Sequence, residues 1–247
     1  MVRWLLGDSM HPGGLALTGK LARLLDVPPN SRVLDLGSGS GATAVHLART
    51  LGCRVVGVTL EASGVAAGRE KARQQGVAGL VEFVRGDWSQ APLREGSFDA
   101  IVAECALSIL PDKKAALQRC HSLLKEGGRL GLSDVTVNGP LPPELDSLLA
   151  DAGCLGGALT LEQYREITES TGFALNCYQE VPEAASGFLR EISGKLLMVE
   201  AAAGLGKLPL GPEVLREVKR TLSVLRGAVD HGVLSYGLLV AHREASK

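Results

Sequence analysis

A short apolar run followed at once by three closely spaced glycines is the feature that most limits how this chain can fold. The run SRVLDLG, residues 31–37, predicts a buried strand, and ATAVHLARTLG, residues 42–52, has the spacing of a helix. Gly37, Gly39 and Gly41 lie at the junction and let the backbone come close to a ligand. A structural turn can also use glycines, but a strand, glycine loop and helix in this order favour an open α/β sheet with a ligand crevice.

The same alternation of strand and helix continues along the chain. Further strands are predicted at residues 53–60, 80–87, 98–104, 129–137, 173–181 and 235–244, and helices at residues 63–76, 112–128, 160–172 and 183–230. Strands that alternate with helices of ten or more residues form right-handed crossovers and a sheet covered on both faces. We therefore predict an α/β fold with a doubly wound, mostly parallel seven-stranded sheet and a helical insertion before the last strand.

The length and charge of the chain restrict its organisation and its partners. A chain of 247 residues with 45% hydrophobic residues suits one domain over residues 1–247. We expect residues 1–20 to form an N-terminal lid, for which an ordered turn is the alternative, and residues 138–234 to form a substrate-side loop and helical insertion. The 26 Lys and Arg balance 27 Asp and Glu, which favours a small-molecule substrate and gives no reason to expect nucleic acid or membrane partners.

Apolar runs are short, and the first ten residues turn polar too soon for a secretory signal. Five cysteines, an odd number in a chain of this size, fit reduced thiols better than disulfides. These observations predict a cytoplasmic protein, as a monomer or a dimer.

The glycine loop LDLGSGSGA resembles motif I of class I S-adenosylmethionine-dependent methyltransferases. RGDW, residues 85–88, and LLKEGGRLGLSDV, residues 123–135, are similar to two further segments of that family. The resemblance implies a Rossmann-like fold and S-adenosylmethionine as cofactor, with the carboxylate of Asp87 accepting from the adenine amine. The implied cofactor-binding residues are Asp35, Gly37, Ser38, Gly39, Gly41, Thr59, Leu60, Glu61, Gly86, Asp87, Trp88 and Glu104.

Alternatives remain at several of these positions. Most members of the family hold the ribose with an acid after the second strand, where this chain has Thr59 and, two residues on, Glu61. Asp87 could instead be a turn residue. Glu104 could instead orient the substrate or simply end its strand. A nicotinamide enzyme uses a similar crevice, but its glycine spacing is GxGxxG rather than the GxGxG found here.

The cysteines separate by their predicted place in the sheet. Cys53 begins a strand and Cys120 lies within a helix, so both are expected to be small buried hydrophobic residues. Cys177 is in or beside the sixth strand. Cys105 follows the fourth strand at the same edge as the glycine loop, and Cys154 lies in the glycine-rich loop AGCLGGAL. Two thiols at one edge would suit a soft ligand.

The residues around both cysteines are similar to arsenite methyltransferases. ECALSILPDKK, residues 104–114, and AGCLGGALTLEQY, residues 152–164, match their segments, and the resemblance implies that Cys105 and Cys154 bind trivalent arsenic as substrate. The arsenic lone pair would attack the sulfonium methyl without a general base, so we expect the protein mainly to position the reactants. A repeated cycle would need a thiol reductant such as glutathione or thioredoxin as co-substrate.

Two departures from that subfamily leave the substrate open. Ala44 stands where relatives often have a further cysteine, and the usual C-terminal cysteine motifs are not recognisable after residue 180. The alternatives are a methyltransferase for another small organic acceptor and a non-catalytic protein that binds the cofactor or a metalloid.

Overall fold

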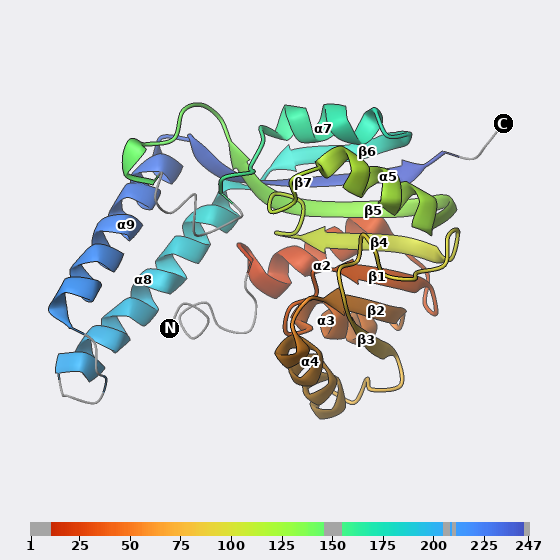
Figure 1. The fold of residues 1–247 in the computed structure, drawn as a ribbon, viewed down its shortest axis with the longest axis horizontal. Coiled ribbons are helices and arrows are strands. Elements are labelled where there is room, and N and C mark those ends of the chain that lie inside the picture. Colours follow the sequence, from red (N-terminus) through yellow and green to blue (C-terminus); the bar gives the residue numbers. More distant parts are fainter. Residues whose placement is uncertain (1–10, 146–154, 205–207, 209–210, 245–247) are drawn as a thin grey trace.

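The structure is a computed structural model that describes residues 11–145, 155–204, 208 and 211–244. Its centre is a seven-stranded sheet in the order β3-β2-β1-β4-β5-β7-β6 (Figure 1). The strands are β1 (Arg32–Leu36), β2 (Arg54–Thr59), β3 (Val81–Arg85), β4 (Phe98–Glu104), β5 (Leu124–Val137), β6 (Phe173–Glu180) and β7 (Leu234–Arg243). β7 runs antiparallel between β5 and β6, and the other pairs from β3 to β5 are parallel.

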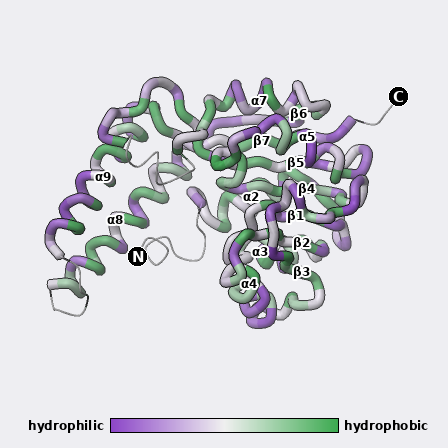
Figure 2. The backbone as a smooth tube through the Cα atoms, viewed as in Figure 1, coloured by the Kyte–Doolittle hydropathy of each residue, from purple (hydrophilic) through white to green (hydrophobic). Residues whose placement is uncertain are grey.

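Helices cover both faces of this sheet. One core packs α2 (Gly14–Leu25), α3 (Ala42–Leu51) and α4 (Ala62–Gln74) against one face, and a second core packs α5 (Lys113–Leu123) and α7 (Leu161–Glu169) against the other. Figure 2 shows hydrophobic stretches along the central strands between these layers. The prediction of a doubly wound α/β fold with seven strands is therefore confirmed.

The helix predicted over residues 112–128 is too long. α5 ends at Leu123, and residues from Leu124 onward belong to β5, where Leu124 pairs with Phe98 of β4. Arg243 donates hydrogen bonds to the carbonyls of His121 and Leu124, at 3.0 and 2.7 Å. A side chain from the last strand thus satisfies carbonyl groups at the helix end, a long-range cap that the local sequence does not reveal.

Residues 183–230, predicted as one helical region, form a hairpin of two helices. α8 (Pro182–Gly204) and α9 (Pro212–Asp230) lie side by side and project from the sheet (Figure 1). Gly211 and Pro212 begin α9, where a proline is favoured because its missing N–H needs no partner. The hairpin lies immediately before β7, as the predicted helical insertion does.

Residues 138–234, expected to form a substrate-side loop and helical insertion, include the helix and the sixth strand predicted at residues 160–172 and 173–181. The region contains the short helix η1 (Pro143–Leu145), then α7 and β6, which belong to the body of the sheet. Thr160 begins α7 with a capping box, in which its hydroxyl accepts from the Gln163 N–H and the Gln163 side chain accepts from the Thr160 N–H.

Among the described helices, none is both long and apolar enough to cross a membrane.

Candidate active site

The predicted site residues come from strands whose carboxyl ends meet at one edge of the sheet. Leu36 of β1 lies beside Ala103 of β4, and Val58 of β2 lies beside Leu36 on the other side. The glycine loop, Glu104 and the residues after Thr59 therefore leave neighbouring parallel strands in the same direction. This is the edge at which open α/β sheets bind ligands.

The glycines of the loop have different roles. Gly37, Gly39 and Gly41 have φ angles of 71°, 50° and 79°, in the left-handed region. A Cβ atom on Gly41 would lie 2.5 Å from the Phe83 ring, so this glycine permits α3 to pack closely on β3. Within 4 Å, a Cβ on Gly39 would meet only the Gly37 carbonyl oxygen, at 3.9 Å, among the described residues. The Cα of Gly39 therefore has space beside it for a ligand, whereas its carbonyl oxygen packs against Gly64, where it would lie 2.5 Å from a Cβ.

Two buried polar side chains at the glycine loop each have one atom that lacks a hydrogen-bond partner among the described residues. Asp35 is 2% exposed and Ser38 is 8% exposed, and Asp35 Oδ2 and Ser38 Oγ have no partner in the part of the chain that the structure describes. Burial, and then the charge of Glu104, raise the pKa of Asp35 well above its ordinary value. Buried polar atoms are nearly always paired, so these two atoms are available to a polar ligand.

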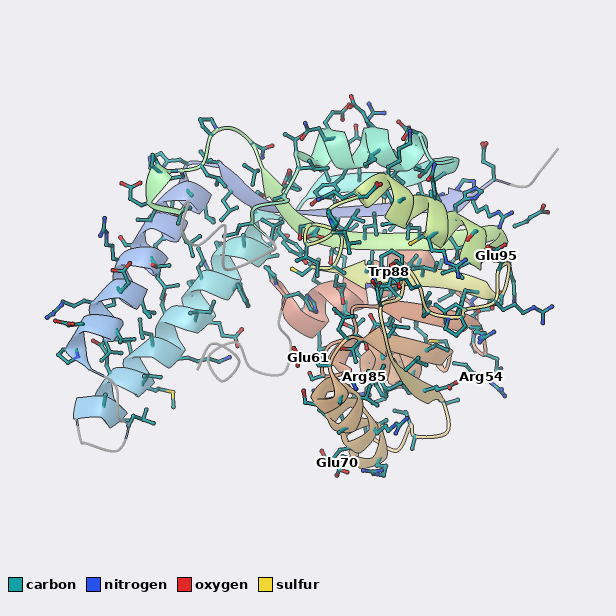
Figure 3. All side chains as sticks on the ribbon, in the orientation of Figure 1. Arg54, Glu61, Glu70, Arg85, Trp88 and Glu95 are labelled. Atoms are coloured by element: carbon teal, nitrogen blue, oxygen red, sulfur yellow. The ribbon has the colours of Figure 1, made fainter. Side chains whose placement is uncertain are left out.

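The residues after β2 differ in how accessible they are. Thr59 is buried, and its Oγ1 would lie 3.1 Å from a Cβ on Gly64. Leu60 is 67% exposed and Glu61 is exposed at the start of α4, where its carboxylate accepts from the Ser63 hydroxyl at 3.1 Å (Figure 3). Of the two ribose candidates, Glu61 is exposed, whereas Thr59 is buried.

The segment after β3 forms a turn. The N–H of Gly86 donates to the Thr59 carbonyl at 3.0 Å, which joins this segment to the end of β2. Asp87 Oδ1 accepts from the Ser89 N–H at 2.9 Å and from its hydroxyl at 2.7 Å, so Asp87 does form a side-chain turn. Asp87 is exposed, whereas Trp88 is 8% exposed and packs in the core beneath (Figure 3).

Glu104 ends β4 and is bonded on several sides by protein groups. Its Oε2 accepts from the hydroxyls of Thr18 at 2.9 Å and Thr43 at 2.7 Å, and lies 3.4 Å from His11 Nε2. Its Oε1 accepts from the Ser133 hydroxyl at 3.4 Å. The carboxylate is thus occupied within the fold.

Cys105 has a left-handed backbone with a φ of 50°, which is uncommon for a residue other than glycine. Its N–H donates to the Ser133 carbonyl at 2.9 Å, and its Sγ lies 3.3 Å from the hydroxyl of Tyr236. The side chain is half-buried. Its predicted partner, Cys154, lies outside the described residues.

The other thiols behave as the sequence predicts for Cys53 and Cys120. Both are buried, and burial raises the pKa of Cys53 to about 11 and that of Cys120 to about 12. Cys177 lies in β6 and is partly buried. Within the described residues, no group of three or more His, Cys, Asp or Glu side chains could hold a metal ion.

With this geometry, the chain can be compared with known proteins. The family described as "Methyltransferase domain" matches residues 28–172, which is more than half of the chain and includes the glycine loop and Cys105. The chain belongs to this methyltransferase family. The family resemblance inferred from the glycine loop is confirmed at this level.

This methyltransferase domain has relatives of differing specificity. It is 30% identical over 179 residues to methyltransferase GfsG of Streptomyces halstedii, a match that covers 71% of this chain and 64% of that protein. It is 38% identical over 153 residues to an arsenite methyltransferase of Aquipseudomonas alcaligenes, covering 58% of this chain and 44% of that protein. The chain thus spans less than two thirds of the length of both relatives.

A solved structure supports the fold of the methyltransferase domain over nearly its full length. Phosphoethanolamine N-methyltransferase 2 of Haemonchus contortus, in complex with S-adenosyl-L-methionine, superposes with a TM-score of 0.82 at 20% identity. The match covers 98% of this chain and 56% of that one. The Rossmann-like fold extends beyond the region matched by the family.

Several residues of the methyltransferase domain join this edge without having been predicted to do so. Tyr236 is wholly buried, donates to the Ser133 carbonyl at 3.1 Å and contacts the Ser133 hydroxyl as well as Cys105. Asp134 Oδ2 accepts from the N–H groups of Leu107 and Ser108, each at 2.9 Å, and so fixes the loop after Cys105. In the sequence, the signals for these residues are a tyrosine in the predicted last strand and the aspartate of the Ser133–Asp134 pair. Neither signal shows which residues they contact.

Proposed function

We propose that this chain is a methyltransferase that uses S-adenosylmethionine to methylate a small acceptor bound beside Cys105. When bound, the cofactor supplies an electrophilic methyl group on a sulfonium. The observation that carries the proposal is the pair of unpartnered buried atoms, Asp35 Oδ2 and Ser38 Oγ, beside the open backbone of Gly39. Their donor set fits this cofactor, which carries an amino group, hydroxyls and a cationic sulfur.

The roles of the surrounding residues follow from their accessibility. Glu61, exposed after β2, would accept from the ribose hydroxyls, and Asp87 would accept from the adenine amine through its second carboxylate oxygen, the one not bonded to Ser89. A carboxylate accepting from a hydroxyl or amine orients the ligand and favours its bound state. Asp35 would lie against the cationic part of the ligand, which favours its ionised form.

For the acceptor, we propose trivalent arsenic, as arsenite or its thiol conjugate, held by the thiolates of Cys105 and Cys154. Thiolates are the ligands that such a soft centre prefers, and an arsenite methyltransferase is among the relatives. The arsenic lone pair forms the bond to the methyl carbon as the carbon–sulfur bond breaks, which leaves S-adenosylhomocysteine and formally oxidised arsenic. Two thiols, from two glutathione molecules or from thioredoxin, would then supply the two electrons that return arsenic to the trivalent state, and would form a disulfide.

The second candidate acceptor is a small organic molecule. It is favoured by the contact between Cys105 Sγ and Tyr236, because a thiol that bonds to a buried phenol contributes to the protein's own packing. Relatives such as methyltransferase GfsG are not named for arsenic.

Two measurements test the proposal in sequence. Calorimetric titration with S-adenosylhomocysteine should show one site in the wild type, and no binding would refute the methyltransferase function. Arsenite, S-adenosylmethionine and glutathione should then yield methylated arsenic, with both Cys105→Ser and Cys154→Ser inactive. Cys177→Ser is the matched control, since its thiol is also partly buried but lies on the edge strand β6. Normal turnover by both serine variants at positions 105 and 154 would leave only the organic acceptor.

A further inference from the structure

Glu104 connects three parts of the chain that are distant in sequence. Thr18 lies on α2, Thr43 on the first turn of α3 and Ser133 on β5, and each donates its hydroxyl to the Glu104 carboxylate. His11, just before α2, lies 3.4 Å from the same oxygen as the two threonines. The Glu104 side chain is 3% exposed, so these groups, rather than water, satisfy its carboxylate.

This group of contacts borders the glycine loop. Leu36, the last residue of β1, lies beside Ala103 of β4, and Gly37 and Glu104 are the residues that directly follow these two. Thr43 belongs to the helix that begins directly after Gly41. The contacts therefore join the N-terminal residues 11–18 to both ends of the loop that we assign to the cofactor.

The Glu104 carboxylate is bonded mainly to protein groups. Its Oε2 already accepts two short hydrogen bonds, and its Oε1 accepts from Ser133. A buried carboxylate is costly unless its hydrogen bonds are complete. Two of its partners, His11 and Thr18, come from the N-terminal residues, so the stable arrangement of Glu104 requires these residues to be docked.

We propose that Glu104 is a positioning residue that holds residues 11–18 against the glycine loop and thereby sets the affinity for the cofactor. It acts through His11, Thr18 and Thr43 rather than by contact with the cofactor. This assignment rests on the function proposed above and differs from the cofactor-binding role that the sequence predicts for Glu104.

The test measures affinity for S-adenosylhomocysteine, by calorimetry, in folded variants of the whole chain. Thr18→Val has nearly the same shape but lacks the hydroxyl, and it should weaken binding about tenfold, as expected for losing a hydrogen bond to a charged group. Thr18→Ser keeps the hydroxyl and should bind within about twofold of the wild type. Glu104→Gln should also weaken binding, and should raise the KM for S-adenosylmethionine more than it lowers kcat.

Glu180→Gln is the matched control, because Glu180 Oε2 also accepts a threonine hydroxyl, from Thr136 at 2.9 Å, but it contacts no N-terminal residue in the described part of the chain. It should bind like the wild type. If the wild type binds and Thr18→Val binds equally well, the positioning role is refuted while the proposed function stands. If the wild type does not bind, the proposed function fails, and this inference with it.

A measurement on the wild type alone guards against variants that do not fold. Amide hydrogen exchange over residues 11–18 should slow when S-adenosylhomocysteine is added, because the ligand and the docked residues stabilise each other. Unchanged exchange in the presence of saturating ligand would overturn the proposal, even if every variant were unstable.

Discussion

Cys105 Sγ lies 3.3 Å from the hydroxyl of Tyr236, a residue 131 positions further along the chain. The same hydroxyl donates to the Ser133 carbonyl at 3.1 Å. The thiol proposed to bind the acceptor, which directly follows β4, is therefore fixed through β7 and β5, and the geometry of the site depends on the antiparallel part of the sheet.

Tyr236→Phe should lower the free energy of unfolding by about 1–2 kcal/mol, because it leaves the buried Ser133 carbonyl and Cys105 thiol without this partner. Urea denaturation of the two proteins measures the difference. Tyr178→Phe is the control, since Tyr178 is 44% exposed and its hydroxyl can bond to water. Equal losses in both variants would show that the buried hydroxyl has no special role.

Asp35→Asn should stabilise the unliganded protein at neutral pH and weaken binding of S-adenosylhomocysteine. The pKa of Asp35 is raised in the fold, chiefly by burial and then by Glu104, so the folded state binds its proton more tightly than the unfolded state does. The stability that Asp35 contributes is therefore present below its pKa in the unfolded state, and is lost as pH rises through its higher pKa in the folded state. Thermal unfolding of wild type and variant should be measured between about pH 4 and pH 8. The Tm of the variant should exceed that of the wild type by a difference that widens as pH rises.

Asp99→Asn should have the opposite effect on stability. Burial raises the pKa of Asp99, but hydrogen bonds from the Lys125 side chain and the Arg32 N–H outweigh it and hold the pKa below its ordinary value. Its contribution is present above the unfolded pKa and is lost as pH falls through the folded one. Destabilisation by Asp35→Asn, with the same sign as Asp99→Asn, would show that Asp35 is paired in solution.

Gly41→Ala should destabilise the protein by about 2–4 kcal/mol, because the new methyl group combines overpacking with a left-handed φ. Its Cβ would lie 2.5 Å from the Phe83 ring and 2.8 Å from Gly68 Cα. Gly76→Ala separates the two effects, since Gly76 has a φ of 71° with no atom within 4 Å of its Cβ. Urea denaturation should show only the backbone cost, about 1 kcal/mol, in that variant. Equal losses of unfolding free energy in Gly41→Ala and Gly76→Ala would refute close packing at Gly41.

Glu61→Gln should weaken S-adenosylhomocysteine binding about tenfold, as expected for losing a charged acceptor for a hydroxyl pair. Glu70→Gln, on the exposed side of the same helix and bonded to Arg73 and Gln74, should leave affinity unchanged. Calorimetry measures both. If Thr59→Val rather than Glu61→Gln weakened binding, the ribose assignment would pass to the buried threonine.

The parallel part of the fold follows directly from the sequence. The strand before Gly37 and the helix after Gly41 occur where the local pattern places them, and Cys53 and Cys120 are buried as predicted. These features depend on neighbouring residues, on apolar spacing and on glycine. Contacts between distant segments do not follow from local pattern. Glu104, for example, accepts hydrogen bonds from Thr18, 86 residues before it, and from Ser133, 29 residues after it.

The roles of individual acids were harder to predict for the same reason. Glu104 looks like a residue facing the ligand when only its strand is known, and its occupied carboxylate is evident only when α2 and α3 are in place. The predicted end of α5 was wrong because the residues from Leu124 onward belong to β5, and Arg243, from the last strand, satisfies carbonyls at the helix end. The arsenic ligands Cys105 and Cys154 stay a prediction.

The order of strands has a consequence for synthesis on the ribosome. β6 pairs with β7 and β5 also pairs with β7, although β7 is the last of the seven to be made. Until it emerges, β5 is an open edge and β6 has no partner, a state that invites pairing with other chains. The cofactor edge from β1 to β4 is complete much earlier, so a nascent chain would form its glycine loop well before Tyr236 arrives to fix Cys105.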